Sequence, residues 1–219
     1  MKITGAIFDM DGTILDSLGF WDYIWEFFGK KYLSDPAFRP DDVTAKGVRT
    51  VSLKGAMELV YRNCNIGESA EELFKMSYVA LGEFYKERAV LKEGVTEFLD
   101  ELKARGVKMC IASASMAEHV EIIMNKFNLQ KYFPAVISCN DIGRGKEHPD
   151  VFILAHEYLG TDKETTYVFE DSVVAIETAV KAGYKTVGVF DKFNFGIDRI
   201  KEIATYFIDE NENLTKLLA

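Results

Sequence analysis

The chain has 219 residues, of which 48% are hydrophobic, 13% aromatic and 28% charged. This much apolar material fills one sizeable core, or a core domain with a smaller companion, and it excludes a disordered protein. The 35 acidic residues outnumber the 26 basic ones, giving a formal net charge of −9, and Lys and Arg do not cluster, so we expect no nucleic-acid partner.

The first part of the chain contains one strand-like segment, followed by segments with a helical pattern. Residues 3–8 are β-branched and aromatic and lead into a glycine turn, which predicts a buried strand. Residues 20–32 are dense in aromatics, and apolar residues recur at helical spacing over 51–61 and 68–88. We therefore expect a helical block without strands, in which Pro36 and Pro40 bracket a turn.

Beyond residue 91 short apolar strands alternate with amphipathic helices. The expected helices cover 96–105, 116–127, 149–159 and 173–182, and the expected strands 107–112, 135–138, 167–169, 186–189 and 206–208. This alternation predicts an α/β fold with a doubly wound parallel sheet and an inserted α-helical domain. We place the core domain at residues 1–16 and 91–219 and the insertion at 17–90.

Two further features bear on the environment of the protein. No stretch approaches the roughly 20 apolar residues of a membrane span, and the apolar opening is too short for a signal peptide. The cysteines, Cys64, Cys110 and Cys139, are odd in number and lack C-x-x-C spacing, which argues against a disulfide framework or a zinc ribbon. We expect a soluble, cytoplasmic protein with no membrane partner.

Polar residues follow the predicted strands at the edge of a parallel sheet where ligands bind. These are Asp9, Asp11, Ser113, Lys146, Glu170 and Asp171. Taken singly, each has an ordinary explanation: Asp-Gly pairs mark turns, Asp or Ser caps helices, and lysines are usually solvated. A calcium loop does not fit, because the ligand after Asp11 is missing and a strand precedes the motif.

Carboxylates packed this closely stay ionised together only with a cation among them. Hard oxygen ligands suit Mg²⁺, which is the cofactor we predict. A carboxylate facing a phosphoryl group beside such an ion can act as a nucleophile and form an acyl phosphate. A second carboxylate, two residues on, can protonate the leaving oxygen and then deprotonate the attacking water.

Four segments resemble the motifs of the haloacid dehalogenase-like superfamily, in order and spacing. They are FDMDGTILDS at 8–17, IASAS at 111–115, GKEHPDVF at 145–152, and FEDS at 169–172 with Ala182-Gly183. The match spans residues 1 to about 16 and 91 to 190. It is closest to the β-phosphoglucomutase-like phosphatases, which carry a helical cap after the first motif. The resemblance implies a Rossmann-like core with that cap.

The resemblance also implies a role for each matching residue. Asp9 is expected to be the nucleophile that becomes phosphorylated, and Asp11 the general acid/base, with its main-chain carbonyl on the metal. The phosphate-binding residues implied are Ser113, the amide of Ala114, and Lys146. The implied Mg²⁺ ligands are Asp9, Asp11, Glu170 and Asp171.

Two departures from the family pattern concern the third motif and the cap. Lys146 is followed by Glu147 and His148 where the family usually has Lys-Pro-x-Pro. Mutases carry a cap histidine where this chain has Trp21, which disfavours mutase activity and makes Trp21 a possible substrate contact. Arg49 lies near the cap segment that anchors a second phosphate in mutases, but its position differs from that pattern by about one residue.

The leading hypothesis is a Mg²⁺-dependent phosphatase that hydrolyses a small phosphorylated metabolite, such as a sugar phosphate, through a phospho-aspartate. The alternatives are a β-phosphoglucomutase-type hexose-phosphate mutase and a non-catalytic module that binds phosphometabolites. A dehalogenase is disfavoured because those relatives lack the second carboxylate, which is Asp11 here. The substrate and the oligomeric state cannot be predicted from the sequence.

Overall fold

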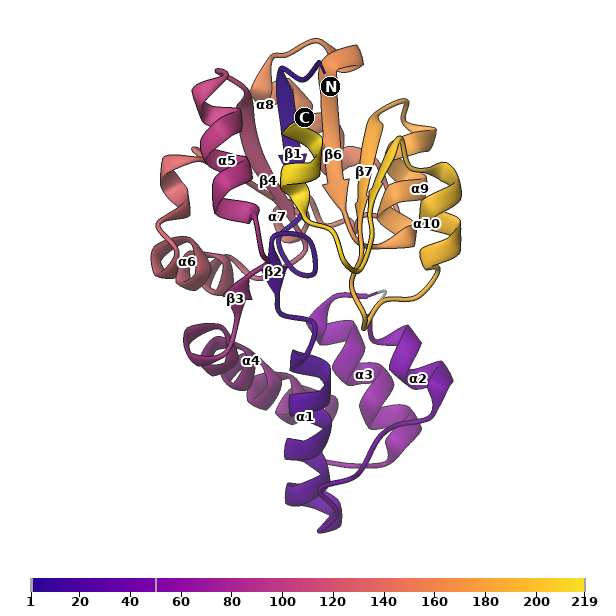
Figure 1. Cartoon of the computed structure of the whole chain (residues 1–219). Helices are drawn as coiled ribbons and strands as arrows, with labels where there is room; N and C mark the ends of the chain where they lie inside the picture. Colours follow the sequence, from indigo (N-terminus) through magenta and orange to yellow (C-terminus); the bar gives the residue numbers. More distant parts are fainter. Residues whose placement is uncertain (1, 50, 219) are drawn as a thin grey trace. The chain divides into compact units, whose positions relative to one another are not determined.

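The computed structural model describes residues 2–49 and 51–218. The chain forms two compact units. The core unit comprises Met1–Ser17 and Ala89–Ala219, and the helical unit comprises Leu18–Arg88. The domain boundaries expected from the sequence, at 16/17 and 90/91, stay a prediction. Figure 1 draws the helices and strands of the chain, with labels where there is room.

The core unit is built on a six-stranded sheet in the order β5-β4-β1-β6-β7-β8, in which all neighbouring strands are parallel. The strands are β1 (Gly5–Phe8), β4 (Lys108–Ser113), β5 (Val136–Ser138), β6 (Thr166–Glu170), β7 (Lys185–Val189) and β8 (Tyr206–Ile208). A separate antiparallel pair joins β2 (Leu15–Asp16) to β3 (Val90–Leu91). The doubly wound parallel core predicted from the alternation is therefore confirmed.

Helices connect these strands. They are α5 (Val95–Ala104), α6 (Ala117–Lys126), α7 (Cys139–Ile142), α8 (Asp150–Leu159), α9 (Val173–Lys181) and α10 (Ile197–Ile203), with 3₁₀ turns at Leu129–Lys131, Lys163–Thr165 and Leu214–Leu218. The predicted helices occur with small shifts at their ends, whereas α7 and α10 were not predicted. Both are too short to show a helical period in the sequence.

Alternating side chains of the sheet form two apolar layers, because successive strand residues point to opposite faces. On one face, Ile7 of β1 and Val168 of β6 pack with Val151 and Phe152 of α8 and with residues of α9. On the other, Phe8 stacks on Phe169 with ring centroids 4.3 Å apart, and Phe98 of α5 meets both rings. The sheet is thus covered on both faces, so the loops that connect strands and helices lie at the ends of the strands.

The helical unit contains α1 (Phe20–Phe28), a π-helical turn at Gly29–Leu33, α2 (Asp42–Gly47), α3 (Leu53–Cys64) and α4 (Ala70–Glu87). Side-chain caps begin three of these helices: Asp41 accepts from the Thr44 amide, Ser52 from Gly55 and Ser69 from Glu72. Among the described residues of this unit there is no strand, as expected. Helix α2 was not predicted, because six residues give little periodicity.

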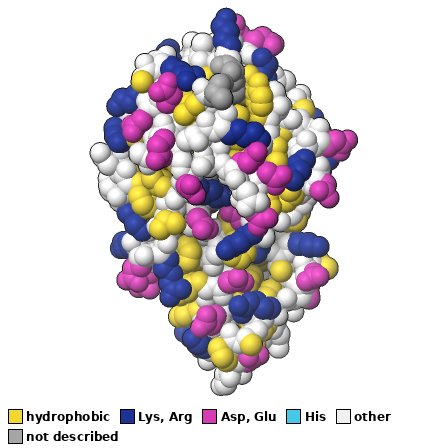
Figure 2. Space-filling model, in the orientation of Figure 1, with side chains coloured by type: hydrophobic (Ala, Val, Ile, Leu, Met, Phe, Trp, Pro, Cys, Tyr) yellow, Lys and Arg dark blue, Asp and Glu magenta, His cyan; other side chains and the backbone are white. Residues whose placement is uncertain are grey.

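The charged surface is mixed. On the face shown in Figure 2, Lys and Arg side chains are interspersed with Asp and Glu and form no continuous basic area. Within the part of the chain that the structure describes, no helix combines the length and the apolar composition that crossing a membrane requires.

Candidate functional site

Strand β1 places the first two acidic residues of the candidate site. It lies between β4 and β6, and the amide of Asp9 donates to the carbonyl of Phe169 at 2.9 Å, so the pairing continues one residue past the strand. The chain then turns at Gly12, whose φ of +83° favours glycine. The central position of β1 puts Asp9 beside the end of β6 rather than at an edge of the sheet.

Three carboxylates meet at this point. Asp9, Glu170 and Asp171 are all buried, and one oxygen from each lies within 4.8 Å of the others. The register of β1 and β6, with Phe8 opposite Phe169, brings Asp9 level with Glu170. Residues separated by about 160 positions in the sequence therefore form one acidic cluster, which we call the carboxylate cluster.

Lys146 is the cation that the structure brings to this cluster. It lies in the turn between α7 and α8, and its ammonium contacts Asp9 and donates to Glu170 at 2.6 Å. The second oxygen of Glu170 accepts from the amides of Asp171 and Ser172 at 2.9 and 2.8 Å, where α9 begins. Both oxygens of Glu170 are therefore held in place.

The electrostatics of the cluster are unbalanced. Burial raises the pKa of Asp9 from 3.8 to about 7, against the lowering effect of Lys146 and with a further raising effect of Glu170 and Asp11. Burial and the neighbouring carboxylates Glu170 and Asp9 also raise the pKa of Asp171 well above its ordinary value. Burial would lower the pKa of Lys146, but Asp9 and Glu170 outweigh it and raise that pKa. One ammonium does not compensate three carboxylates.

The donor set fits a divalent metal ion. Three buried carboxylates supply hard oxygen ligands and two more negative charges than Lys146 neutralises. An ion with two positive charges would restore the balance and return the carboxylates to their ionised forms. The cluster therefore has the composition of a divalent cation site.

Asp11 is held differently from Asp9. Its two carboxylate oxygens accept hydrogen bonds from the hydroxyls of Ser17 and Ser115, both at 2.7 Å. Its carboxylate is not in the cluster. The family resemblance implies that Asp11 binds the metal through its main-chain carbonyl, and that stays a prediction. The two hydroxyl contacts, which the sequence did not predict, fix the carboxylate on both sides.

The loop after β4 carries the predicted phosphate-binding residues. Ser113 is buried at the end of the strand, its hydroxyl accepts from the Ser115 amide at 3.0 Å, and Ala114 between them is exposed. The Asn140 side chain donates to the carbonyls of Ala114 and Ser115 at 3.0 and 3.1 Å. Because Ser115 also bonds Asp11, this loop and the first motif are linked directly.

The remaining predicted residues lie in the helical unit. Trp21 is in α1, where its ring stacks on Trp25 with centroids 5.7 Å apart, and Arg49 follows α2. Both side chains are partly buried. Their roles toward a substrate stay predictions.

Asn194 and Thr13 are contacts of the cluster that the sequence did not predict. Asn194 donates to Asp171 from the segment after β7, and Thr13 donates to the Asp171 carboxylate at 3.2 Å. The rule that ligand-binding residues follow parallel strands applies to β7 as well, and would have pointed to the segment that contains Asn194.

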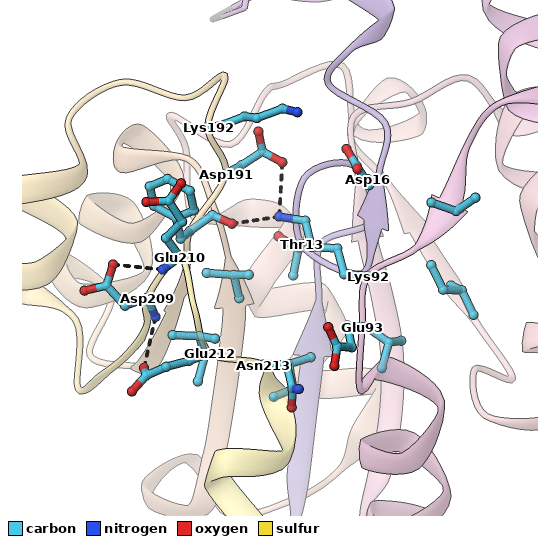
Figure 3. Close-up of a pocket in the computed structure, with 17 residues that line it drawn as sticks. Thr13, Asp16, Lys92, Glu93, Asp191, Lys192, Asp209, Glu210, Glu212 and Asn213 are labelled. Carbon is cyan, nitrogen blue, oxygen red and sulfur yellow. Dashed lines mark hydrogen bonds and ion pairs between the residues drawn. The ribbon is translucent and has the colours of Figure 1, made fainter.

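A cavity of about 350 Å³ lies elsewhere in the core unit, between β2, β3, the segment after β7 and the C-terminal segment. Figure 3 shows Lys92 and Asp191 on its wall, with Thr13 behind them. The carboxylate cluster does not line it; of the cluster's contacts, Thr13 does. The cavity and the cluster are thus neighbouring features.

Comparison with known proteins agrees with this geometry. A family model described as haloacid dehalogenase-like hydrolase matches residues 6–189, which include all three carboxylates. A phosphorylated carbohydrates phosphatase from Thermotoga maritima is 26% identical, with 97% of each chain covered. Hexitol phosphatase B from Escherichia coli K12 is 28% identical over 86% of this chain and 84% of its own.

Solved structures share the fold. A putative β-phosphoglucomutase from Thermotoga maritima has a TM-score of 0.76 at 22% identity, with 94% of each chain covered. A predicted phosphoglycolate phosphatase from Haemophilus somnus has a TM-score of 0.78 at 19% identity, covering 100% of this chain and 99% of its own. The likeness extends through both units of the chain.

Proposed function

The chain belongs to the haloacid dehalogenase-like hydrolase family, and from this premise we propose that it is a Mg²⁺-dependent phosphatase acting on a small phosphorylated metabolite through a phospho-aspartate at Asp9. The observation that carries the proposal is the carboxylate cluster of Asp9, Glu170 and Asp171 with Lys146 against it. A purely structural cluster would be costly, because buried like charges repel one another.

In the proposed reaction an oxygen of Asp9 attacks the phosphorus of a phosphate monoester. The bond from phosphorus to the leaving oxygen breaks, and Asp11 gives that oxygen a proton, releasing an alcohol. A water then attacks the phosphorus of the acyl phosphate, and Asp11 takes its proton. Inorganic phosphate leaves, and Asp9 is regenerated as a carboxylate.

The bonds of Asp11 suit it to this exchange of a proton. The hydroxyls of Ser17 and Ser115 hold both of its oxygens at 2.7 Å, so the carboxyl group keeps one orientation in both half-reactions. Both hydroxyls can donate to the ionised form, and each can rotate to accept when Asp11 is protonated. Asp11 therefore changes protonation state without losing its supports.

The phosphoryl group is proposed to bind between Asp9, Lys146 and the loop at Ser113. The Lys146 ammonium and the Ala114 amide would contact its oxygens, and the Asn140 bonds would hold that loop in place. Asp9, Asp171, Glu170 and the Asp11 carbonyl would hold Mg²⁺. When bound, that ion supplies charge that screens the repulsion between Asp9 and the phosphate oxygens.

The relatives guide the choice of substrate class. The two curated relatives named above are called phosphatases of phosphorylated carbohydrates and of hexitols. We extend this to a phosphorylated sugar or sugar alcohol for this chain, with the helical unit acting as a cap and Trp21 and Arg49 as substrate contacts. We also propose that this protein acts in the cytoplasm.

The test is a phosphate-release screen over sugar phosphates, polyol phosphates and nucleotides, with Mg²⁺ and with EDTA. We expect release from one sugar or polyol phosphate in Mg²⁺, none in EDTA, and loss of release in Asp9→Asn. Asp9→Asn that retains the wild-type rate would refute the proposal. β-Glucose 1-phosphate supplied with its bisphosphate separates the mutase alternative, which isomerises the sugar phosphate without releasing phosphate.

A further inference from the structure

Asn194 makes an unusual pair of contacts with a single residue of the carboxylate cluster. Its side-chain nitrogen lies 2.8 Å from the main-chain carbonyl of Asp171 and also contacts an oxygen of the Asp171 carboxylate. A carboxamide nitrogen carries two protons, so it can donate to both acceptors at once. The contact therefore ties the Asp171 side chain to its own main chain.

The hydrogen bonds to the Asp171 carboxylate come from neutral groups. The hydroxyl of Thr13 donates to one oxygen at 3.2 Å and Asn194 to the other, whereas Asp9 and Glu170 bond the Lys146 ammonium. Neutral donors orient a carboxylate without cancelling its charge. Asp171, which is 4% exposed, is thus oriented by groups that would not compensate a negative charge on it, and a bound cation would do so.

Asn194 is itself held by a tight turn after β7. The carboxylate of Asp191 accepts from the Phe193 amide at 2.9 Å, and its carbonyl accepts from the Asn194 amide at 3.0 Å. Asp191 is as buried as Asp171, at 4% exposed. Both hydrogen bonds of the turn go to its first residue, Asp191, and they fix the backbone from which the Asn194 side chain extends.

Lys92 anchors this turn. Its ammonium pairs with Asp191 at 3.0 Å and donates to the carbonyl of Phe190 at 2.8 Å, as the dashed lines in Figure 3 show. Lys92 comes directly after β3, and its own amide donates to the carbonyl of Ile14 at 3.0 Å. The turn that carries Asn194 is therefore fixed to the backbone of the first motif.

From these contacts we propose that Asn194 is a positioning residue that holds the Asp171 carboxylate in the orientation needed to bind the divalent cation. The inference rests on the proposed function, since it assumes that Asp171 is a metal ligand. Partners of metal ligands fix the orientation of the ligand, and removing one costs about 10- to 100-fold in metal affinity or activity.

The experiment compares wild-type protein with Asn194→Ala, Asn194→Gln and the control Asn211→Ala, which changes an exposed asparagine. MgCl₂ is titrated into EDTA-treated, dialysed protein, and the melting temperature at each concentration gives the dissociation constant for Mg²⁺. Phosphate release is measured over the same Mg²⁺ range. The melting temperature without metal reports separately on any structural damage.

We expect the Mg²⁺ dissociation constant to rise about tenfold or more in Asn194→Ala, to rise less in Asn194→Gln, and to be unchanged in Asn211→Ala. Saturating Mg²⁺ should restore most of the turnover of Asn194→Ala. A lowered metal-free melting temperature with an unchanged dissociation constant would mean a structural role only and overturn the inference. Wild-type protein that neither binds Mg²⁺ nor releases phosphate would overturn the proposed function itself, and this inference with it.

Discussion

Replacing Asp9 by asparagine should make the metal-free protein more stable at neutral pH, although the same change should abolish activity. The pKa of Asp9 is raised from 3.8 to about 7 in the fold, chiefly by burial. Between these values the folded state binds a proton that the unfolded state has lost, so stability falls as the pH rises. Asparagine does not titrate, so the free energy of unfolding of Asp9→Asn does not fall in this way as the pH rises.

The size of the effect follows from the pKa difference. Each unit between the two pKa values corresponds to about 1.4 kcal/mol, which amounts to about 4 kcal/mol at pH 8. At pH 5, about one unit above the lower pKa, the loss of stability is only about 1.5 kcal/mol. The free energy of unfolding of Asp9→Asn relative to wild type should therefore increase by about 3 kcal/mol between pH 5 and pH 8.

Urea unfolding at pH 5, 6, 7 and 8 in the presence of EDTA measures this difference. Asp198→Asn is a matched control, because it removes an exposed aspartate at the start of α10. Its difference from wild type should stay nearly constant over this range. If the stability difference between Asp9→Asn and wild type does not change with pH, the reasoning is refuted, because burial would then not disfavour the ionised form of Asp9.

Three further changes test other contacts. Lys146→Met leaves the carboxylates of the cluster without their ammonium and should destabilise the metal-free protein by about 3–5 kcal/mol in urea at pH 8; an unchanged midpoint would contradict the charge argument. Ser115→Ala removes one of the two hydroxyls on Asp11 and should lower kcat about tenfold in steady-state assays, with KM little changed. Phe98→Ala should cost about 3–5 kcal/mol of stability with kcat retained, since its buried ring packs on the rings of Phe8 and Phe169, which have no part in the proposed reaction.

Much of the core unit could be predicted because its signals are local. A parallel strand buried on both faces appears as a continuous apolar run, as in β4 and β6, and the helices between them show a clear period. Short elements such as α7 and α10 carry no such signal. The antiparallel pair of β2 and β3 depends on two segments about 75 residues apart, and no local pattern reports that pairing.

The residues of the carboxylate cluster could be predicted because the topology of a parallel sheet brings strand ends together. Asp9, Glu170 and Lys146 were expected at one edge for that reason, and the structure gives the contacts between them. The supporting contacts could not be predicted. Asn194 reaches Asp171 from a loop that carries the Lys92–Asp191 ion pair, and such a pair between residues about 100 positions apart leaves no local pattern in the sequence.

The central claim is that Asp9 carries the phosphoryl group, and trapping that group tests it most directly. Borohydride reduces an acyl phosphate to an alcohol, so enzyme quenched during turnover and treated in this way should contain homoserine in place of Asp9. Peptide mass spectrometry should find this change only when substrate and Mg²⁺ are both present, and at no other aspartate. Rapid turnover with an unmodified Asp9, or with the label on another residue, would contradict the mechanism.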